Sequence, residues 1–217
     1  MRYAKYQSRG GGCRAGRHSG RGQPPASLDE GEHGRREQAP AEWLAALKGA
    51  FFQAIERAGI DAKQVRGIGV SGQQHGMVAL DADGVPVYPA KLWCDTETSA
   101  QNSALVETLG GEAGCLEKLG LVLQTGYTAS KVAWLREHQP DAYQRIATLL
   151  LPHDYLNFWL TGERVTEQAT PRAPVTLIPA PSAGKKRCLP PLRRSSTLTV
   201  YCLGSLTPMN PLAAFAR

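Results

Sequence analysis

A four-residue repeat of large apolar side chains marks the first clear element of the chain. Such a repeat places one apolar face along a helix. We expect this helix to begin at Pro40, which suits a first turn, and to end at Gly59. The strand predicted at residues 67–70 is the nearest sheet on which it can pack. The repeat consists of Trp43, Leu47, Phe51 and Ile55, with Leu44 and Phe52 alongside.

Short apolar runs predict β-strands further along the chain. Isoleucine and valine alternate with glycine over residues 67–70, which indicates a strand. Residues 77–80 and 85–88 read as two strands joined by a hairpin turn at residues 81–84. The three leucines at residues 149–151 are typical of a buried strand.

Helices are predicted between and after these strands. We expect Thr96 to cap a helix that runs to residues 110–111, and Ser130 to cap one at residues 131–138. Because strands and helices interleave, the fold class is α/β. The inward residues of the first of these helices are predicted to be Ala100, Ala104, Leu105 and Leu109. Shorter helices are expected at residues 113–119, 141–147 and 155–160.

The net charge of +6 hides three unlike regions. Residues 1–36 hold eight Lys/Arg and three acidic residues. Residues 37–168 hold ten Lys/Arg and sixteen acidic residues, and residues 169–217 hold seven Lys/Arg and no acidic residue. The middle is therefore acidic, and the basic character belongs to the ends. The ends lack aromatic interleaving and any helix-turn-helix or zinc-finger pattern, which argues against nucleic-acid binding.

The chain offers few signals for export or for a membrane. No apolar run is long enough to span a bilayer, and the start has no apolar stretch typical of a secretion signal. Five cysteines without a CxxC pattern favour neither a disulfide framework nor a zinc site. We therefore expect a cytoplasmic protein with no membrane partner.

The polar loop SGQQHG at residues 71–76 is the strongest candidate for chemistry. It follows a strand directly and lies between glycines, a common way to present side chains to a small ligand. Gln73, Gln74 and His75 offer amide and imidazole groups that can hydrogen-bond sugar hydroxyls. The alternative is a surface turn with a structural histidine.

Four stretches together make the middle of the chain resemble the FGGY family of carbohydrate kinases, most closely its xylulokinase members. Each stretch alone is weak, but their order and spacing over about residues 30–168 are specific. The stretches are residues 34–38 with Pro40 and Trp43, residues 71–76 with 92–95, residues 126–135, which resemble the family's first signature, and residues 151–156 with 160–163.

The resemblance implies the actin-like, ribonuclease-H-like fold of a two-domain sugar kinase, present here as an incomplete first domain. D-xylulose or a related ketose would bind in the cleft between the domains, and ATP with Mg²⁺ mostly against the second domain. By match to the family's motif, Gln74 and His75 fall where the ketose hydroxyls are held. Gln73, Trp93 and Asp95 fall beside that pocket.

The resemblance also implies what this chain does not contribute. Lys131 and Trp134 lie in the signature helix, where we interpret their role as mainly structural. The catalytic base and the phosphate hairpin of the family have no match in the frame given. We therefore predict no catalytic residue and no metal ligand here, and expect that this chain does not itself transfer phosphate.

Both ends look like the same gene read in another frame. Codons for residues 1–8, regrouped from the second base, permit Cys-Gly-Thr-Gln-Ser-Thr-Lys, which resembles the family's phosphate hairpin. Codons for residues 169–174, regrouped from the third base, permit Asp-Ala-Ser-Gly-Thr, as the family shows there. We hypothesise that residues 1–29 and 169–217 are disordered or out-of-frame segments around a partial kinase domain at residues 30–168. Genuine additions to the chain are the alternative.

Two functions from other classes stay open on the sequence. One is a non-catalytic sugar-binding module, which needs only the polar loop. The other is a nucleic-acid binder that uses the basic ends, whose binding would be sensitive to salt.

Overall fold

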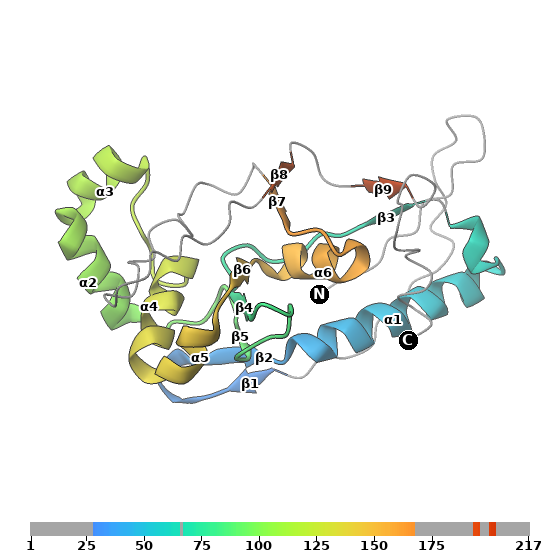
Figure 1. Ribbon diagram of the computed structural model, residues 1–217, viewed down its shortest axis with the longest axis horizontal. Coiled ribbons are helices and arrows are strands. Elements are labelled where there is room, and N and C mark those ends of the chain that lie inside the picture. Colours follow the sequence, from blue (N-terminus) through green and yellow to red (C-terminus); the bar gives the residue numbers. More distant parts are fainter. Residues whose placement is uncertain (1–27, 66, 168–192, 196–199, 203–217) are drawn as a thin grey trace.

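The described part of the chain combines helices on both sides of short strands. The computed structural model describes residues 28–65, 67–167, 193–195 and 200–202, and Figure 1 shows the arrangement of their elements. The predictions for the two flanking segments lie almost entirely outside the described residues. Among the described residues, no helix is both long and apolar enough to cross a bilayer.

Helix α1 (Pro40–Ala58) begins and ends where the sequence predicts. Gly59 caps it in the left-handed conformation at φ 63°, and its N–H donates to the carbonyl of Glu56. The expected apolar face is buried, with Trp43 only 1% exposed. The prediction for Phe52 is wrong, because this side chain is 46% exposed. A residue next in sequence lies about 100° round a helix, so Phe52 is turned away from the face it was expected to share.

The strands pair mostly antiparallel. Strands β1, β2 and β5 form one sheet in the order β1-β2-β5, and β4 pairs with β6. A bridge between Met77 and Lys91 connects these two sheets. Strand β3 pairs antiparallel with β9, and β7 pairs parallel with β8. The bounds are β1 (Asp29–Glu30), β2 (Arg36–Gln38), β3 (Gly67–Gly69), β4 (Val78–Leu80), β5 (Ala90–Lys91), β6 (Thr148–Leu150), β7 (Val165–Glu167), β8 (Arg193–Ser195) and β9 (Val200–Cys202).

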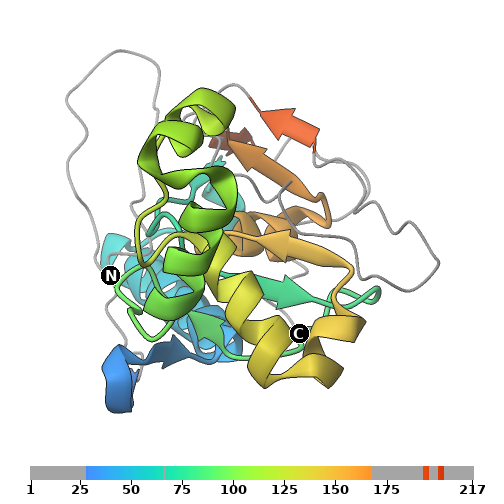
Figure 2. The same ribbon diagram turned by 90° about the vertical axis from the view of Figure 1, so that its left-hand side faces the viewer.

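The remaining helices interleave with these strands, which confirms the α/β class. Figure 2 views the molecule from the end at which α2, α3 and α4 lie. The bounds are α2 (Ser99–Leu109), α3 (Gly111–Leu119), α4 (Thr128–His138), α5 (Pro140–Arg145) and α6 (Pro152–Thr161), with single 3-10 turns at Glu32–Gly34 and Ala62–Gln64.

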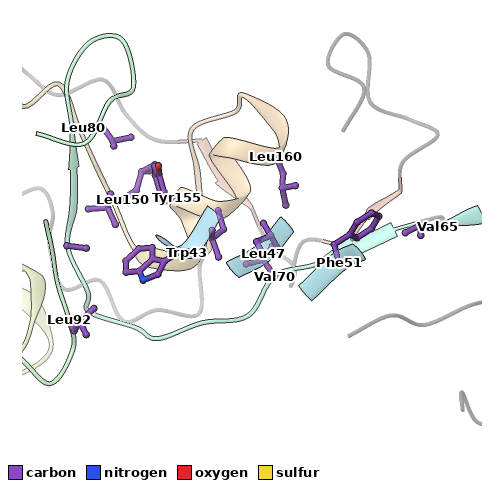
Figure 3. Packing of buried hydrophobic residues seen from close by; sticks show 13 residues of the cluster. Trp43, Leu47, Phe51, Val65, Val70, Leu80, Leu92, Leu150, Tyr155 and Leu160 are labelled. Atoms are coloured by element: carbon purple, nitrogen blue, oxygen red, sulfur yellow. The ribbon is translucent and has the colours of Figure 1, made fainter. Parts of the chain in front are cut away.

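Hydrophobic side chains cover both faces of the β4–β6 pair. On one face, Leu80 and Leu150 pack with α1 and α6, where the rings of Trp43 and Tyr155 meet edge to face at 6.3 Å (Figure 3). On the other face, alternate residues such as Met77 pack with α4 and α5. Successive strand residues point to opposite faces, so this short pair separates two helical layers.

The hairpin after β4 is only partly as predicted. Its turn forms, since the Asp81 carboxylate accepts hydrogen bonds from the N–H groups of Asp83 and Val85. Its second strand does not, and a single bridge joins Leu80 to Pro86. Two backbone hydrogen bonds flank this bridge, from the Asp81 N–H to the Val85 carbonyl and from the Val87 N–H to the Ala79 carbonyl, both at 2.9 Å.

The predicted inward face of α2 is wrong. The helix begins at Ser99 after Thr98, not after Thr96, and Ala100 and Ala104 are exposed. Two polar residues, Gln101 and Asn102, are buried instead.

Hydrogen bonds across helices account for this polar face. The Gln101 side chain donates to Glu137 at 2.7 Å, and the Asn102 side chain donates to the carbonyl of Leu123 at 3.2 Å. The prediction that Ser130 caps α4 is also wrong, because the helix begins at Thr128. The Ser130 hydroxyl instead hydrogen-bonds Thr98 at 2.9 Å from inside the helix.

Candidate functional site

The polar loop at residues 71–76 lies between β3 and β4 and against the start of α6. We call residues 71–76 the sugar loop from here on, after the ligand that the sequence leads us to expect there. Its last residue, Gly76, allows a close approach, because a Cβ there would lie 2.5 Å from the Pro152 ring. A Cβ at Gly72 would lie 3.4 Å from the His153 Cβ. Glycines at positions 72 and 76 therefore let the loop lie close to α6, and only glycine suits position 76.

His75 has an unusual backbone and a defined ring position. Its φ of 60° is in the left-handed region, which few residues other than glycine adopt. Its imidazole stacks on the Tyr127 ring, with 4.0 Å between centroids and 9° between planes. Burial, and then the charge of Lys131, lower the pKa of His75. The ring is therefore neutral at pH 7, with one nitrogen to donate and one to accept.

Lys131 holds the backbone of the sugar loop from helix α4. Its Nζ donates to the His75 carbonyl at 2.6 Å and also to the Gly126 carbonyl. The Thr128 hydroxyl donates to the same His75 carbonyl at 3.3 Å. Burial lowers the pKa of Lys131 to about 7, although the charge of Asp95 pulls it upward.

The turn at Trp93 completes the site. The Trp93 indole is 60% exposed, while its backbone N–H donates to the Gln73 side-chain oxygen at 2.9 Å. Gly126, at φ 96°, lies so close that a Cβ there would be 2.6 Å from the Trp93 carbonyl. Three segments therefore meet here: the sugar loop, the Trp93 turn and the loop that carries Tyr127.

Asp95 lies behind the site and is fully buried. One of its carboxylate oxygens accepts from Lys91 Nζ at 3.2 Å and from the Arg36 N–H at 2.9 Å. Its other oxygen accepts from the Glu97 N–H at 3.2 Å. These bonds join the Trp93 turn to strand β2, so Asp95 contributes to the site through the backbone it holds.

Lys91 is the hub of this buried cluster. Besides Asp95, its Nζ contacts carboxylates of Glu37 at 2.8 Å and Glu97 at 2.5 Å, and it lies 3.9 Å from the centre of the Trp134 ring. Burial lowers the pKa of Lys91, but the hydrogen bonds to Glu37 and Glu97 outweigh burial, so the pKa is raised overall.

The three carboxylates around Lys91 are the group among the described residues that could ligate a metal. Their oxygens lie within 4.8 Å of one another. However, the Lys91 Nζ lies within 3.2 Å of an oxygen of each carboxylate, so it occupies the place that a metal ion would need. The described residues therefore do not fit a Mg²⁺ ion.

All five residues predicted for the site lie on the sugar loop or on the turn at residues 93–95 that is bonded to it, and Gln74 is exposed on the loop. Sequence reasoning did not assign Tyr127 or Lys91 to the site. A lysine between buried strand residues was the available signal for Lys91, and Tyr127 stood inside the recognised signature without a role.

Comparisons with known proteins agree on one family. The sequence profile of the FGGY family of carbohydrate kinases, N-terminal domain, matches residues 14–171. A xylulose kinase from Haemophilus influenzae is 52% identical over 139 residues, which cover 62% of this chain and 28% of that protein. A xylulose kinase from Streptomyces coelicolor is 40% identical over 147 residues, covering 68% of this chain and 29% of that protein.

Solved structures give the same result for the backbone. A crystal structure of a "xyloylose kinase" from Brucella ovis superposes with a TM-score of 0.62 at 31% identity, covering 67% of this chain and 30% of that one. A xylulose kinase from Rhodospirillum rubrum gives 0.60 at 27% identity, covering 66% and 29%. The chain thus spans less than a third of the length of these relatives.

Proposed function

Because the chain belongs to the FGGY family of carbohydrate kinases, we propose that it forms the sugar-binding side of an ATP-dependent kinase for D-xylulose. The family assignment confirms the actin-like, ribonuclease-H-like fold, represented here by its first domain. The proposed reaction of the whole protein transfers the γ-phosphate of ATP to a terminal hydroxyl and forms D-xylulose 5-phosphate. Relatives at 52% and 40% identity are named xylulose kinases, which supports this choice of sugar.

The observation that carries the proposal is the fixed position of the His75 ring. A neutral imidazole held against Tyr127 can present the ring nitrogen other than Nδ1 to a hydroxyl, as donor or acceptor according to the tautomer. The buried Nδ1 of this ring has no hydrogen-bond partner within the described part of the chain. The exposed Gln74 lies on the same loop and the exposed Trp93 indole on the adjoining turn, and together these groups suit a small polyhydroxylated ligand.

ATP and Mg²⁺ belong to the proposal for the whole protein. Phosphoryl transfer depends on cations around the phosphates and on a base for the acceptor hydroxyl. The acidic cluster around Lys91 does not serve as the metal site, because the Lys91 ammonium lies between its carboxylates. We assign no transfer step to the described residues, and we place the protein in the cytoplasm, where free thiols such as Cys94 and Cys115 persist.

Calorimetric titration of D-xylulose into the full chain tests the proposal. We expect saturable binding that the change His75→Ala weakens at least about tenfold, equivalent to ~1.4 kcal/mol. His138→Ala is the matched control, since His138 also stacks on an aromatic ring, Trp134, at 4.6 Å and 9°. Absence of saturable heat in the unmodified chain, or equal affinity in His75→Ala, would contradict the proposal.

The division of the chain is a separate proposal. We propose a partial kinase domain at residues 30–168 with flanks read in another frame. The family profile matches residues 14–171, which include this whole domain and also reach into the first flank. Sequencing the DNA across the codons for residues 1–30 and 165–175 tests it: a single-base correction at each junction should restore one long frame. If no such correction restores the frame, the flanks are genuine additions to the chain.

A further inference from the structure

We propose that Lys131 is a positioning residue that sets the conformation of the sugar loop and thereby the affinity for the sugar. This inference rests on the proposed function, because it assigns to Lys131 the placement of the His75 ring. It goes beyond a structural role in helix α4, since the side chain acts outside its own helix. Lys131 is fully buried, and its Nζ reaches carbonyls on two separate loops.

The two carbonyls belong to the two segments that carry the stacked rings. One is the carbonyl of His75 itself, and the other is that of Gly126, which precedes Tyr127. A single ammonium therefore fixes the distance between the backbone of one ring and the backbone of the other. The 4.0 Å stack of His75 on Tyr127 follows from this shared donor.

The backbone of His75 needs an external restraint. Its φ of 60° is unfavourable for a residue with a Cβ. The next residue, Gly76, is pressed against Pro152 and cannot relieve the conformation by moving toward α6. Hydrogen bonds from Lys131 and Thr128 to the His75 carbonyl hold the peptide in this orientation from the opposite side.

The choice of lysine argues against simple filling of the core. Burying an ammonium is unfavourable unless its protons are bonded, and no carboxylate lies within ion-pair distance of Lys131 in the described part of the chain. The pKa of Lys131 is lowered for the same reason, because burial disfavours the charged form. An apolar side chain would fill the space without this penalty but could not bind the two carbonyls.

The test combines a binding measurement with a probe of the loop in the full chain. D-xylulose is titrated by calorimetry, and the proton NMR signals of the His75 ring are followed without sugar and assigned by their loss in His75→Ala. We expect Lys131→Met to weaken binding about tenfold or more and to move the ring signals toward those of an unstacked histidine. Thr128→Val removes the weaker of the two donors and should cause a smaller change in the same direction.

Lys118→Met is the matched control, because the Lys118 ammonium also donates to a backbone carbonyl, that of Leu109, but lies far from the loop in an exposed position. It should leave both readouts unchanged. Unchanged ring signals and unchanged affinity in Lys131→Met would overturn the inference. Should that variant fail to fold, Thr128→Val decides by the same two readouts.

The two readouts separate the inference from the proposed function. Ring signals that move in Lys131→Met, in a chain that does not bind D-xylulose, would support the positioning role and refute the choice of sugar. Binding that is tight in the unmodified chain and equally tight in Lys131→Met would support the sugar and refute the positioning role.

Discussion

Two fully buried lysines lie within this site, and their surroundings differ completely. Lys91 contacts three carboxylates, those of Glu37, Asp95 and Glu97, and its pKa is raised. Within the described part of the chain, the Lys131 Nζ hydrogen-bonds only carbonyl oxygens, and the pKa of Lys131 is lowered to about 7. Burial acts on both in the same direction, so the difference comes from the partners.

The comparison separates a lysine that stabilises the fold from one that shapes the loop. The Lys91 cluster ties strands β2 and β5 to the Trp93 turn through full charges, whose loss leaves other charges unpaired. The Lys131 bonds are directed at two backbone carbonyls, whose loss leaves polar groups unsatisfied but no net charge. The first should therefore matter mostly for stability, and the second mostly for the position of the sugar loop.

The largest expected effect is that of Lys91→Met. This change leaves three carboxylates within 4.8 Å of one another without a counter-ion, and breaking such a buried pair from one side typically destabilises by about 3–5 kcal/mol. Urea unfolding of the full chain at pH 7 measures it, with the exposed Lys63→Met as control. A loss below about 1 kcal/mol would show that the cluster does not depend on Lys91.

The next effect is a dependence of stability on pH. Folded Lys131 loses its proton near pH 7, whereas the unfolded chain keeps that proton up to the ordinary pKa of 10.5. Unfolding therefore takes up a proton between these values, and the free energy of unfolding rises with pH by at most about 1.4 kcal/mol per unit.

Urea unfolding at pH 7.5, 8.5 and 9.5 isolates this term when the unmodified chain is compared with Lys131→Met. The difference between the two should change by the stated slope, because other titrating groups cancel. The raised pKa of Lys91 acts in the opposite sense and only at higher pH, since its contribution is lost as pH rises through the folded pKa. Parallel curves for the two proteins would contradict the assignment to Lys131.

A smaller effect is expected for Asp95→Asn, a change at the residue that connects the two lysines. The amide can keep the bond from the Arg36 N–H but loses a charge beside Lys91, so we expect a loss of about 1–3 kcal/mol. Because the charge of Asp95 raises the pKa of Lys131, that pKa should also fall further. A pH series extended down to pH 5.5, on this variant and on the unmodified chain, should show the rise beginning at lower pH in the variant. An unchanged onset would contradict a link between the two lysines.

The smallest effect is expected for Glu97→Gln. The Glu97 side chain is 19% exposed, and two carboxylates remain on Lys91 after the change. We expect a change in the free energy of unfolding below about 1 kcal/mol, measured by urea unfolding beside Lys91→Met. A loss as large as that of Lys91→Met would mean that the three carboxylates are not interchangeable.

Much of the architecture could be predicted from local pattern. The period of α1, its cap at Gly59 and the turn at Asp81 were all readable, because each depends on residues a few positions apart. The polar face of α2 was not readable, since Gln101 and Asn102 find their partners on segments more than twenty residues away.

The site divides in the same way. The sequence by itself determined the sugar loop and the positions of His75 and Trp93, since motif and spacing are properties of the chain. Only the tertiary structure decided which lysine is surrounded by carboxylates and which by carbonyl oxygens. Lys91 and Lys131 are the same residue type, and each is followed by an apolar residue, but the groups that set their pKa values come mainly from other elements. Electrostatic character depends on distance in space and on exclusion of water, and both arise only when the chain folds.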